Sequence, residues 1–338
     1  MKIILDLDTG IDDALAIAYC LGSPDAELIG ITGTYGNVTV EQGVKNSRAL
    51  LSVLGYPDIP VIPGRDRPWG RGPASPFSPS EASSFIHGSN GLGGVEVNEY
   101  VAAEDELLGG EATEESSCVT SSEDGKDISG ESAMAFYRDA VQRYGDDLTI
   151  VPTGALTTVA EAMKRYEDVT NARIVLMGGA LTVPGNVGAV AEANISQDPD
   201  AADYVFRHGT NVTMVGLDVT LQTLLTKAHT HQWREQGTRA GKLYAEIVDY
   251  YIGAYATTSP YLGGCGLHDP LAVAVALDPS LVTFYDTNLK VDCGGRTIGD
   301  EQRMQDPVKR THVALAVDAT QFVEELMVRV GNLFDRAG

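Results

Sequence analysis

Short apolar runs alternate with helical patterns along most of the chain, and this alternation limits the possible folds more than any other feature. The runs expected to form strands are rich in Ile, Val and Leu on both faces, as strands are when helices cover both sides of a parallel sheet. They lie at 2–7, 28–33, 59–62, 148–152, 173–177 and 211–217. We therefore predict an α/β fold with a Rossmann-like, open and mainly parallel β-sheet flanked by helices.

The helical patterns between these runs agree with this fold. Several end immediately before a Gly, which is a common stop signal because Gly readily adopts the left-handed conformation that closes the last turn. They cover 12–21, 39–54, 130–144, 157–166 and 198–208. We expect the C-terminal third to add further helices and small strands, namely helices near 227–236, 240–257, 270–277 and 319–334 and strands near 288–293 and 312–317.

Two segments differ from this pattern. Residues 63–98 form a loop-rich segment in which Pro, Gly and Ser are dense. Residues 99–131 contain eleven acidic residues and one Lys. Because such a composition buries little apolar surface, we expect 99–131 to be an acidic, mobile insertion. A solvated loop explains it better than a calcium-buffering tail.

The charge and cysteine content narrow the function classes. A formal net charge of -23 repels phosphates and anionic lipids, so we expect neither nucleic acid nor a membrane as a partner. No apolar run is long enough for a secretory signal or a bilayer span, which favours a cytoplasmic protein. The cysteines at 20, 118, 265 and 293 form no CxxC pair, so neither a disulfide framework nor a zinc site is expected.

Polar residues follow strand after strand of the predicted sheet. In an open α/β sheet, ligands bind in the crevice beyond the carboxyl ends of the strands. The residues that come after these strands, or just before a later helix, are Asp8, Asp12, Asp13, Asn37, Thr153, Asn186, Glu192, Asn194, His268 and Asp269. Their common position predicts one site at this edge of the sheet.

The stretch "IILDLDTGIDDALAIAY" places Asp6, Asp8, Asp12 and Asp13 within eight residues. Unneutralised, a pair of carboxylates 4 Å apart repels by roughly 4 kcal/mol at an effective dielectric of 20. Capping of the following helix would account for Asp12 and Asp13, because the helix dipole favours acidic residues in the first turn. It does not account for Asp8, whereas a hard divalent cation such as Ca²⁺ or Mg²⁺ does.

These motifs resemble those of a known family. "DLDTGIDDALA" is similar to the N-terminal signature of the nucleoside hydrolases, the inosine–uridine-preferring ribohydrolases. Further segments resemble the same family in the same order, namely "TGTYGNVT", "IHGSNGLGG", "VPTGALTTVA", "VLMGGA" with "GNVGAVAEANISQDPDAA", "VTMVGLDVT" and "LHDPLAVAVAL". The resemblance covers nearly the whole chain apart from the acidic insertion.

The resemblance implies a metal site and one catalytic domain over 1–338. Ca²⁺ would be bound by Asp8, Asp13, the backbone carbonyl of Thr153 and Asp269, all of them oxygen ligands of the kind that calcium prefers. The residues implied to bind the sugar are Asp12, Asn37, Asn186, Glu192 and Asn194, and His87 is implied to lie near the base on a mobile loop.

The resemblance also implies a reaction. The family hydrolyses the N-glycosidic bond of ribonucleosides to ribose and free base. Asp8 would act as general base toward a Ca²⁺-activated water, and His268 would protonate the departing base. A homodimer or homotetramer is expected.

Some residues depart from the family pattern. Ala193 stands where relatives often carry an aromatic residue near the base, Thr158 replaces a usual Asn, and "HGSNG" differs from the commoner "HGESG". Tyr255 or Tyr261 could supply a stacking surface instead, although a core-facing Tyr is equally common. The choice between purine and pyrimidine therefore stays open.

Two alternatives remain open on sequence alone. The first is a non-catalytic protein that binds nucleosides or ribose and keeps the metal site. The second is a metal-dependent phosphatase of the haloacid dehalogenase type, whose DxD motif normally continues with Gly-Thr or Gly-Val rather than "TGIDD".

Overall fold

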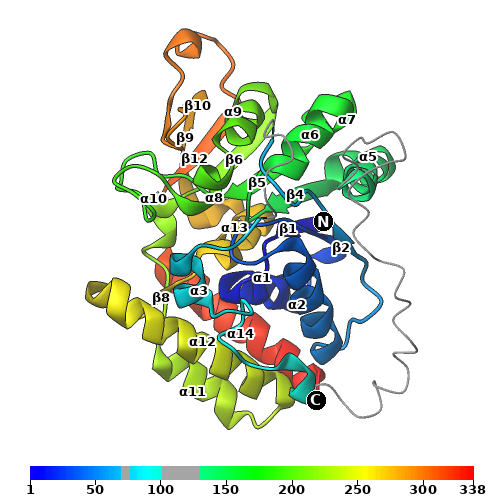
Figure 1. The fold of residues 1–338 in the computed structure, drawn as a ribbon, viewed down its shortest axis with the longest axis vertical. Coiled ribbons are helices and arrows are strands. Elements are labelled where there is room, and N and C mark those ends of the chain that lie inside the picture. Colours follow the sequence, from blue (N-terminus) through cyan, green and yellow to red (C-terminus); the bar gives the residue numbers. More distant parts are fainter. Residues whose placement is uncertain (70–76, 101–129) are drawn as a thin grey trace.

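The computed structural model describes residues 1–69, 77–100 and 130–338 (Figure 1). Nearly all of the predicted acidic insertion, 99–131, lies outside the described residues. Among the described helices, none has both the length and the apolar character needed to cross a bilayer.

An eight-stranded sheet in the order β3-β2-β1-β4-β5-β6-β12-β9 forms the centre of the structure. Neighbouring strands are parallel, except that β9 is antiparallel to β12. The mainly parallel sheet is as predicted. The strands are β1 (Lys2–Leu7), β2 (Glu27–Gly33), β3 (Val61–Pro63), β4 (Leu148–Pro152), β5 (Arg173–Met177), β6 (Asn211–Val215), β9 (Val282–Thr287) and β12 (Thr311–Val317).

Helices cover both faces of this sheet, as the apolar strands require. One face packs against α1, α13 and α14 through side chains such as Leu5 and Val151, and the other packs against α5, α6 and α9 through Ile4 and Ile150. The helices are α1 (Ile11–Gly22), α2 (Val40–Val53), α3 (Glu81–His87), α5 (Glu131–Tyr144), α6 (Thr157–Arg165), α7 (Glu167–Thr170), α8 (Ala193–Gln197), α9 (Pro199–His208), α10 (Leu217–Thr220), α11 (Lys227–Glu235), α12 (Arg239–Thr258), α13 (His268–Leu277) and α14 (Ala319–Arg336).

The structure adds elements that the sequence patterns do not predict. The antiparallel strand β9 was missed because it lies at the edge of the sheet, where Thr283 and Tyr285 are exposed and the run is not uniformly apolar. The strand expected near 288–293 is β10 (Leu289–Val291), which pairs with β11 (Thr297–Gly299) in a separate hairpin. A further small pair joins β7 (Leu224–Leu225) to β8 (Cys265–Gly266).

Part of the loop-rich segment 63–98 is helical. The helix α3 begins after Ser80, whose side-chain oxygen accepts a hydrogen bond from the backbone N–H of Ser83 and so caps the first turn. Figure 1 shows α3 beside α12, on the side of the molecule where the carboxyl end of β1 leads into α1. This helix therefore borders the region in which the polar residues gather.

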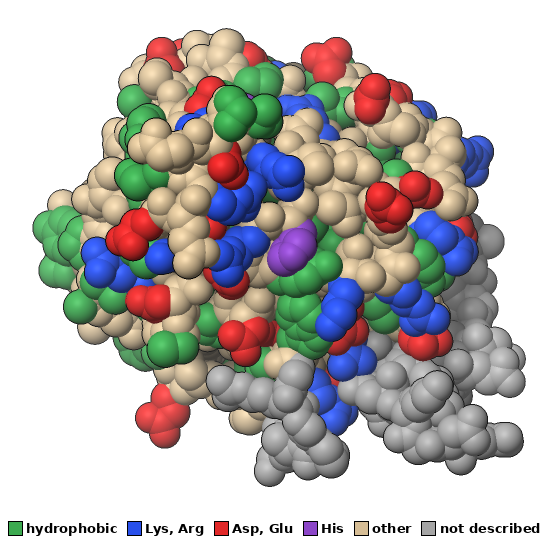
Figure 2. All heavy atoms as spheres, turned by 90° about the horizontal axis from the view of Figure 1, so that it is seen from above, with side chains coloured by type: hydrophobic (Ala, Val, Ile, Leu, Met, Phe, Trp, Pro, Cys, Tyr) green, Lys and Arg blue, Asp and Glu red, His purple; other side chains and the backbone are tan. Residues whose placement is uncertain are grey.

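One face of the molecule carries side chains of both charges. In the face seen in Figure 2, Lys and Arg side chains alternate with Asp and Glu. Several of the basic residues form ion pairs, as Arg207 does with Asp203 and Asp300.

Candidate active site

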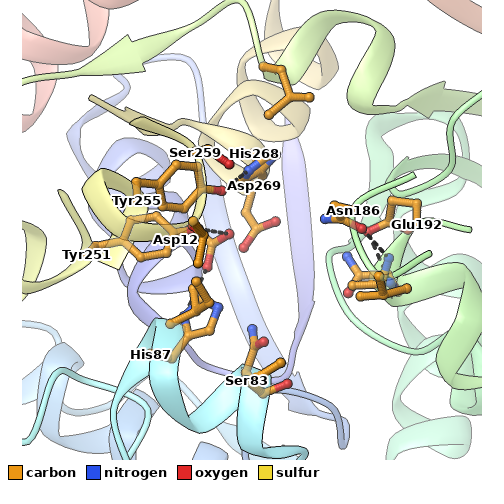
Figure 3. A pocket seen from close by; sticks show the side chains of 18 of the residues that line it. Asp12, Ser83, His87, Asn186, Glu192, Tyr251, Tyr255, Ser259, His268 and Asp269 are labelled. Atoms are coloured by element: carbon orange, nitrogen blue, oxygen red, sulfur yellow. Dashed lines mark hydrogen bonds and ion pairs between the residues drawn. The ribbon is translucent and has the colours of Figure 1, made fainter. Parts of the chain in front are cut away.

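A cavity of about 390 Å³ lies at the carboxyl ends of the central strands. Segments that are far apart in the sequence meet here, because the parallel strands all end at this edge. Nine of the predicted site residues line it: Asp12, Asn37, His87, Thr153, Asn186, Glu192, Asn194, His268 and Asp269 (Figure 3). Asp8 and Asp13 are not among the lining residues, and both are buried against them.

Three carboxylates cluster at the cavity floor, where Asp12 and Asp269 line the cavity and Asp13 is buried against them. One oxygen from each of Asp12, Asp13 and Asp269 lies within 4.8 Å of the other two. Asp12 and Asp13 come from the first turn of α1 and Asp269 from the first turn of α13, two helices that pack together on one face of the sheet. The structure thus brings Asp12, predicted to bind sugar, into the group of carboxylates that was predicted to bind metal.

Ionisation of these carboxyl groups is costly, mainly because they are buried and also because neighbouring carboxylates repel the added charge. These two effects raise the pKa of Asp269 well above its ordinary value and the pKa of Asp13 to about 6. No Lys or Arg is among the described residues that line the cavity. Asp12 Oδ1 is buried and has no hydrogen-bond partner among the described residues. The donor set is all oxygen and has no protein cation beside it, which suits a hard divalent cation.

Asp8 is oriented by the loop that follows β2. One of its carboxylate oxygens accepts a hydrogen bond from the backbone N–H of Asn37 at 2.7 Å, and the other accepts one from Asn37 Nδ2 at 3.0 Å. Burial, and next the charge of Asp13, raises the pKa of Asp8 well above its ordinary value. The close approach of this loop to Asp8 requires Gly36, because a Cβ atom at that position would overlap Asp8 Oδ2.

Asp13 is fixed on both of its oxygens. Asp13 Oδ2 accepts a hydrogen bond from the backbone N–H of Gly10, and Asp13 Oδ1 accepts one from Thr153 Oγ1, each at 2.7 Å. The Thr153 carbonyl, at the end of β4, accepts a hydrogen bond from Asn194 Nδ2 at 2.7 Å. A carbonyl oxygen has a second lone pair, so this bond leaves the Thr153 oxygen able to bind another group.

Asp6 does not join this cluster. Its Oδ1 accepts a hydrogen bond from Thr32 Oγ1 at 2.6 Å, and the same Thr32 oxygen lies 2.6 Å from the Tyr137 hydroxyl of α5. Burial raises the pKa of Asp6 to about 7. The alternation of β1 thus gives Asp6 and Asp8 the same face, but only Asp8 reaches the edge of the sheet where the cavity lies.

The opposite wall of the cavity is formed by the segment between β5 and α8. Glu192 caps α8, accepting hydrogen bonds from the backbone N–H groups of Asn194 and Ile195. Its Oε2 also accepts one from the backbone N–H of Gly179 at 2.9 Å. Asn186 Oδ1 accepts one from the backbone N–H of Ala193 at 3.0 Å. Figure 3 shows Asn186 and Glu192 across the cavity from Asp12 and Asp269.

His268 is held between two hydroxyl groups at the start of α13. Its Nε2 lies 2.7 Å from the Tyr255 hydroxyl, and its Nδ1 lies 2.8 Å from Thr220 Oγ1. Burial lowers the pKa of His268, which favours the neutral ring. Sequence reasoning missed Thr220, although it ends the matched segment "VTMVGLDVT".

His87, from α3, faces the same cavity. Its Nδ1 accepts a hydrogen bond from the backbone N–H of Ile11 at 3.2 Å, so the ring proton of the neutral form is on Nε2. Burial lowers the pKa of His87 to about 4. Tyr251, which sequence reasoning also missed, packs beside His87 and donates a hydrogen bond to Asp12 Oδ2 at 3.2 Å.

Both tyrosines named as possible stacking residues line the cavity. Tyr255 points inward to His268, whereas Tyr261 lies at the rim and is 81% exposed. Ala193 also lines the cavity, so its small side chain contributes directly to the shape of the wall.

Comparison with known proteins is consistent with this geometry. The family model described as "Inosine-uridine preferring nucleoside hydrolase" matches residues 3–324. An inosine-uridine preferring nucleoside hydrolase from Leishmania major is 33% identical over 342 residues, covering 98% of each chain. Uridine nucleosidase 1 from Arabidopsis thaliana is 31% identical over 306 residues, covering 89% of this chain and 82% of that protein.

Solved structures also match nearly the whole chain. The structure of a purine-preferring ribonucleoside hydrolase from Gardnerella vaginalis is 50% identical, with a TM-score of 0.87, and the match covers 99% of this chain and 100% of that one. The plant nucleoside hydrolase PpNRh1 is 28% identical with a TM-score of 0.79, and the match covers 98% of both chains.

Proposed function

Because this chain belongs to the inosine-uridine preferring nucleoside hydrolase family and hydrolyses ribonucleosides to ribose and free base, we propose that the cavity described above performs the reaction. In this proposal Ca²⁺ is the cofactor, Asp8 is the general base and His268 is the acid that protonates the leaving base. The buried carboxylate cluster, which has no protein cation beside it, is the observation that carries the proposal.

The residues present fit a divalent cation. Asp8, Asp13, Asp269 and the carbonyl of Thr153 would bind it, and Asp12, whose Oδ1 accepts no hydrogen bond from a described residue, belongs to the same carboxylate cluster. A hard cation held there would supply Lewis-acid chemistry, lowering the pKa of a nearby water. Calcium suits the site because its flexible coordination accepts carboxylate and carbonyl oxygens together.

The side chains around the cluster then have separate tasks. Asp8, held by two N–H donors of Asn37, removes a proton from the attacking water. The sugar hydroxyls bind to Asp12, Asn37, Asn186, Glu192 and Asn194. As the bond to the base lengthens, the sugar gains oxocarbenium character and water adds to the opposite face, as in inverting glycoside hydrolysis.

The base leaves toward His268. The hydroxyls of Tyr255 and Thr220 hold the ring on both sides, and the imidazolium form of the ring carries a proton on each nitrogen. Because burial lowers the pKa of His268, this imidazolium is a stronger acid than an exposed one. It gives one proton to a nitrogen of the base and returns to the neutral imidazole, so that the base departs as a neutral molecule. His87, on α3, closes the other side of the base.

We propose purine ribonucleosides as the preferred substrates. Support comes from the Gardnerella vaginalis protein, which is described as purine-preferring and is 50% identical over nearly the whole length. The small Ala193 in the cavity wall leaves room for a two-ring base.

The remaining expectations extend this proposal. Residues 1–338 would act as one catalytic domain, because Asp13 and Asp269, which are far apart in the sequence, contribute to one cluster. Cys20 and Cys265 are free thiols, which favours a reducing compartment such as the cytoplasm. Assembly as a homodimer or homotetramer stays a prediction.

A nucleoside panel tests the proposed function. Inosine, adenosine, guanosine, uridine and cytidine would be assayed for release of reducing sugar before and after chelation, with Ca²⁺ added back. We expect the purine nucleosides to react fastest, chelation to abolish turnover and Ca²⁺ to restore it. Full activity in chelator would contradict the metal assignment, and binding of nucleosides without ribose release would identify a non-catalytic binding protein.

A further inference from the structure

The outer part of the cavity differs from its floor in chemistry. It lies between α3 on one side and the end of α12 with the short 3₁₀ helix η3 (Pro260–Leu262) on the other. Apart from the imidazoles of His87 and His268, the described residues that line it are neutral and carry mainly hydroxyl or small apolar groups: Ser80, Ala82, Ser83, Ile86, Leu221, Tyr255, Thr258, Ser259 and Tyr261. With the ribose on the carboxylate floor, the base extends into this outer part.

Ser259 has a hydroxyl group that is available for a ligand. Its backbone N–H donates to the Tyr255 carbonyl at 2.7 Å and ends α12, which fixes the position of the residue. Its Oγ makes no hydrogen bond with any described residue, and the residue is only partly buried. Figure 3 shows Ser259 on the same wall as Tyr255 and His268, across the cavity from His87 and Ser83.

Ser83, on the opposite wall, makes hydrogen bonds at the start of its own helix. Its backbone N–H donates to Ser80 Oγ at 3.0 Å, and the two side-chain oxygens also lie 3.0 Å apart. Its hydroxyl therefore already has a partner in the cap of α3. Of these two serines, Ser259 is the one with an unused hydroxyl on the wall of the proton donor.

The shape of a purine connects Ser259 to His268. A purine carries N7 and the substituent at position 6 on the same edge, where guanine presents two acceptors and adenine presents an acceptor and a donor. If His268 protonates N7, a side chain next to His268 on the same wall meets the 6-substituent. A hydroxyl can donate to a 6-oxo group or accept from a 6-amino group by rotating its proton.

We propose that Ser259 recognises the 6-substituent of purine ribonucleosides, and that its hydroxyl lets the enzyme accept 6-oxo and 6-amino purines to a similar extent. This inference rests on the proposed function, since it places the base against His268. It also gives a reason for a preference for purines, because a pyrimidine has no edge with both a protonated N7 and a 6-substituent beside it.

The test uses three substrates that differ only at position 6: inosine, adenosine and purine riboside, which has no 6-substituent. We expect the unsubstituted enzyme to have kcat/KM values for inosine and adenosine within about tenfold of each other. Ser259→Ala should lower both about three- to tenfold, the typical effect of one neutral hydrogen bond, and should leave purine riboside within about twofold. Ser259→Thr, which keeps the hydroxyl, should retain most of the activity on both.

Two matched variants control for structural effects. Thr257→Ala removes an exposed hydroxyl of α12 that is two residues before Ser259 and does not line the cavity, and Ser83→Ala removes the hydroxyl of the opposite wall that already has Ser80 as its partner. Neither should change the ratio of inosine to purine riboside.

Three outcomes would overturn the inference. These are an equal loss on all three substrates in Ser259→Ala, a loss on inosine or adenosine alone, and no loss at all. Absence of ribose release from all three substrates by the unsubstituted enzyme would overturn the proposed function as well, so the two failures are distinguishable.

Discussion

The floor of the cavity and its outer part are built from different elements and from different chemical groups. The floor consists of buried carboxylates placed by strand ends and by the first turns of α1 and α13. The outer part consists of hydroxyl and apolar side chains from α3, α12 and η3, and reaches the surface at Tyr261. All ribonucleosides share the ribose, whereas the base varies. In the proposed function, the division therefore separates the groups that break the bond from those that select the base.

The two parts also differ in how their residues depend on one another. In the floor, Asn37 binds Asp8, Thr153 binds Asp13, and Asn194 binds the Thr153 carbonyl. A change in any one of these groups disturbs the next. In the outer part, Ser259 and Tyr261 make no side-chain hydrogen bond to another described residue. Substitutions should accordingly have large effects in the floor and small, base-dependent effects outside it.

The largest effect is expected from Asp8→Ala. In the proposed mechanism this variant loses both the general base and a metal ligand, and general-base catalysis alone contributes a factor on the order of 10² to 10⁴. We expect kcat to fall by at least about a thousandfold and Ca²⁺ binding, measured by calorimetry, to weaken. Asp25→Ala, at an exposed carboxylate in a turn, is the control. Near-normal kcat in Asp8→Ala would refute the assigned role.

His268→Ala tests the boundary between the two parts, because His268 is proposed to act on the base but lies in α13 next to Asp269 of the floor. We expect kcat on inosine to fall on the order of 10²-fold or more, and kcat on nitrophenyl riboside, whose leaving group needs no proton, to fall much less. His231→Ala, at an exposed position on α11, should change neither. Equal losses on both substrates would show that His268 is not the acid.

The sequence predicts much of the fold because β1, β4 and β5 are apolar on both faces and the helices between them end at recognisable signals. It also predicts that Asp8 and Thr153 approach one another, because parallel strands end at one edge of a sheet. That Asp269 joins them is implied by the family resemblance. The roles of these residues in binding and catalysis stay predictions.

Contacts made by tertiary packing could not be read from the sequence. Tyr251 donates to Asp12 across 239 positions, and Thr220 meets His268 across 48, with no local pattern that signals either contact. The place of Asp6, one step further into the sheet than Asp8, follows from the strand, whereas the contacts of Asp6 do not. Only the packing of α5 places Tyr137 against the Thr32 that binds Asp6.

A smaller effect is expected from Gly154→Ala, which tests how tightly the floor is packed. A Cβ atom at this position would lie 2.5 Å from Thr34 Cγ2 and 3.1 Å from Asp8 Cβ. We expect the free energy of unfolding to fall by about 1–3 kcal/mol and kcat to fall about tenfold or more as Asp8 shifts. Gly253→Ala, in α12 with no atom within 4 Å of the new Cβ, should instead be stabilising by up to about 1 kcal/mol. If both variants kept full activity, Asp8 would not need its observed position.

The smallest effect is expected where the two parts are joined. Asn46 Nδ2 donates to the Thr9 carbonyl at 3.1 Å, in the turn between β1 and α1, and to the Asn90 carbonyl at 2.8 Å, in the loop that follows His87. Asn46→Ala should lower the free energy of unfolding by about 1–3 kcal/mol, because it leaves buried carbonyl groups without a donor. Urea unfolding measures this change, and Lys45→Ala, at an exposed position on α2, is the control.

The kinetics of Asn46→Ala test whether the floor and the outer part of the cavity act independently. If Asn46 serves mainly to hold the His87 loop over the base, KM for inosine should rise severalfold while kcat stays within about twofold, since the floor keeps its own hydrogen bonds. An equal fall in kcat would mean that the Thr9 bond positions the first turn of α1, where Asp12 and Asp13 lie. The outer loop and the floor would then act as one unit, and the division between bond cleavage and base selection would not hold.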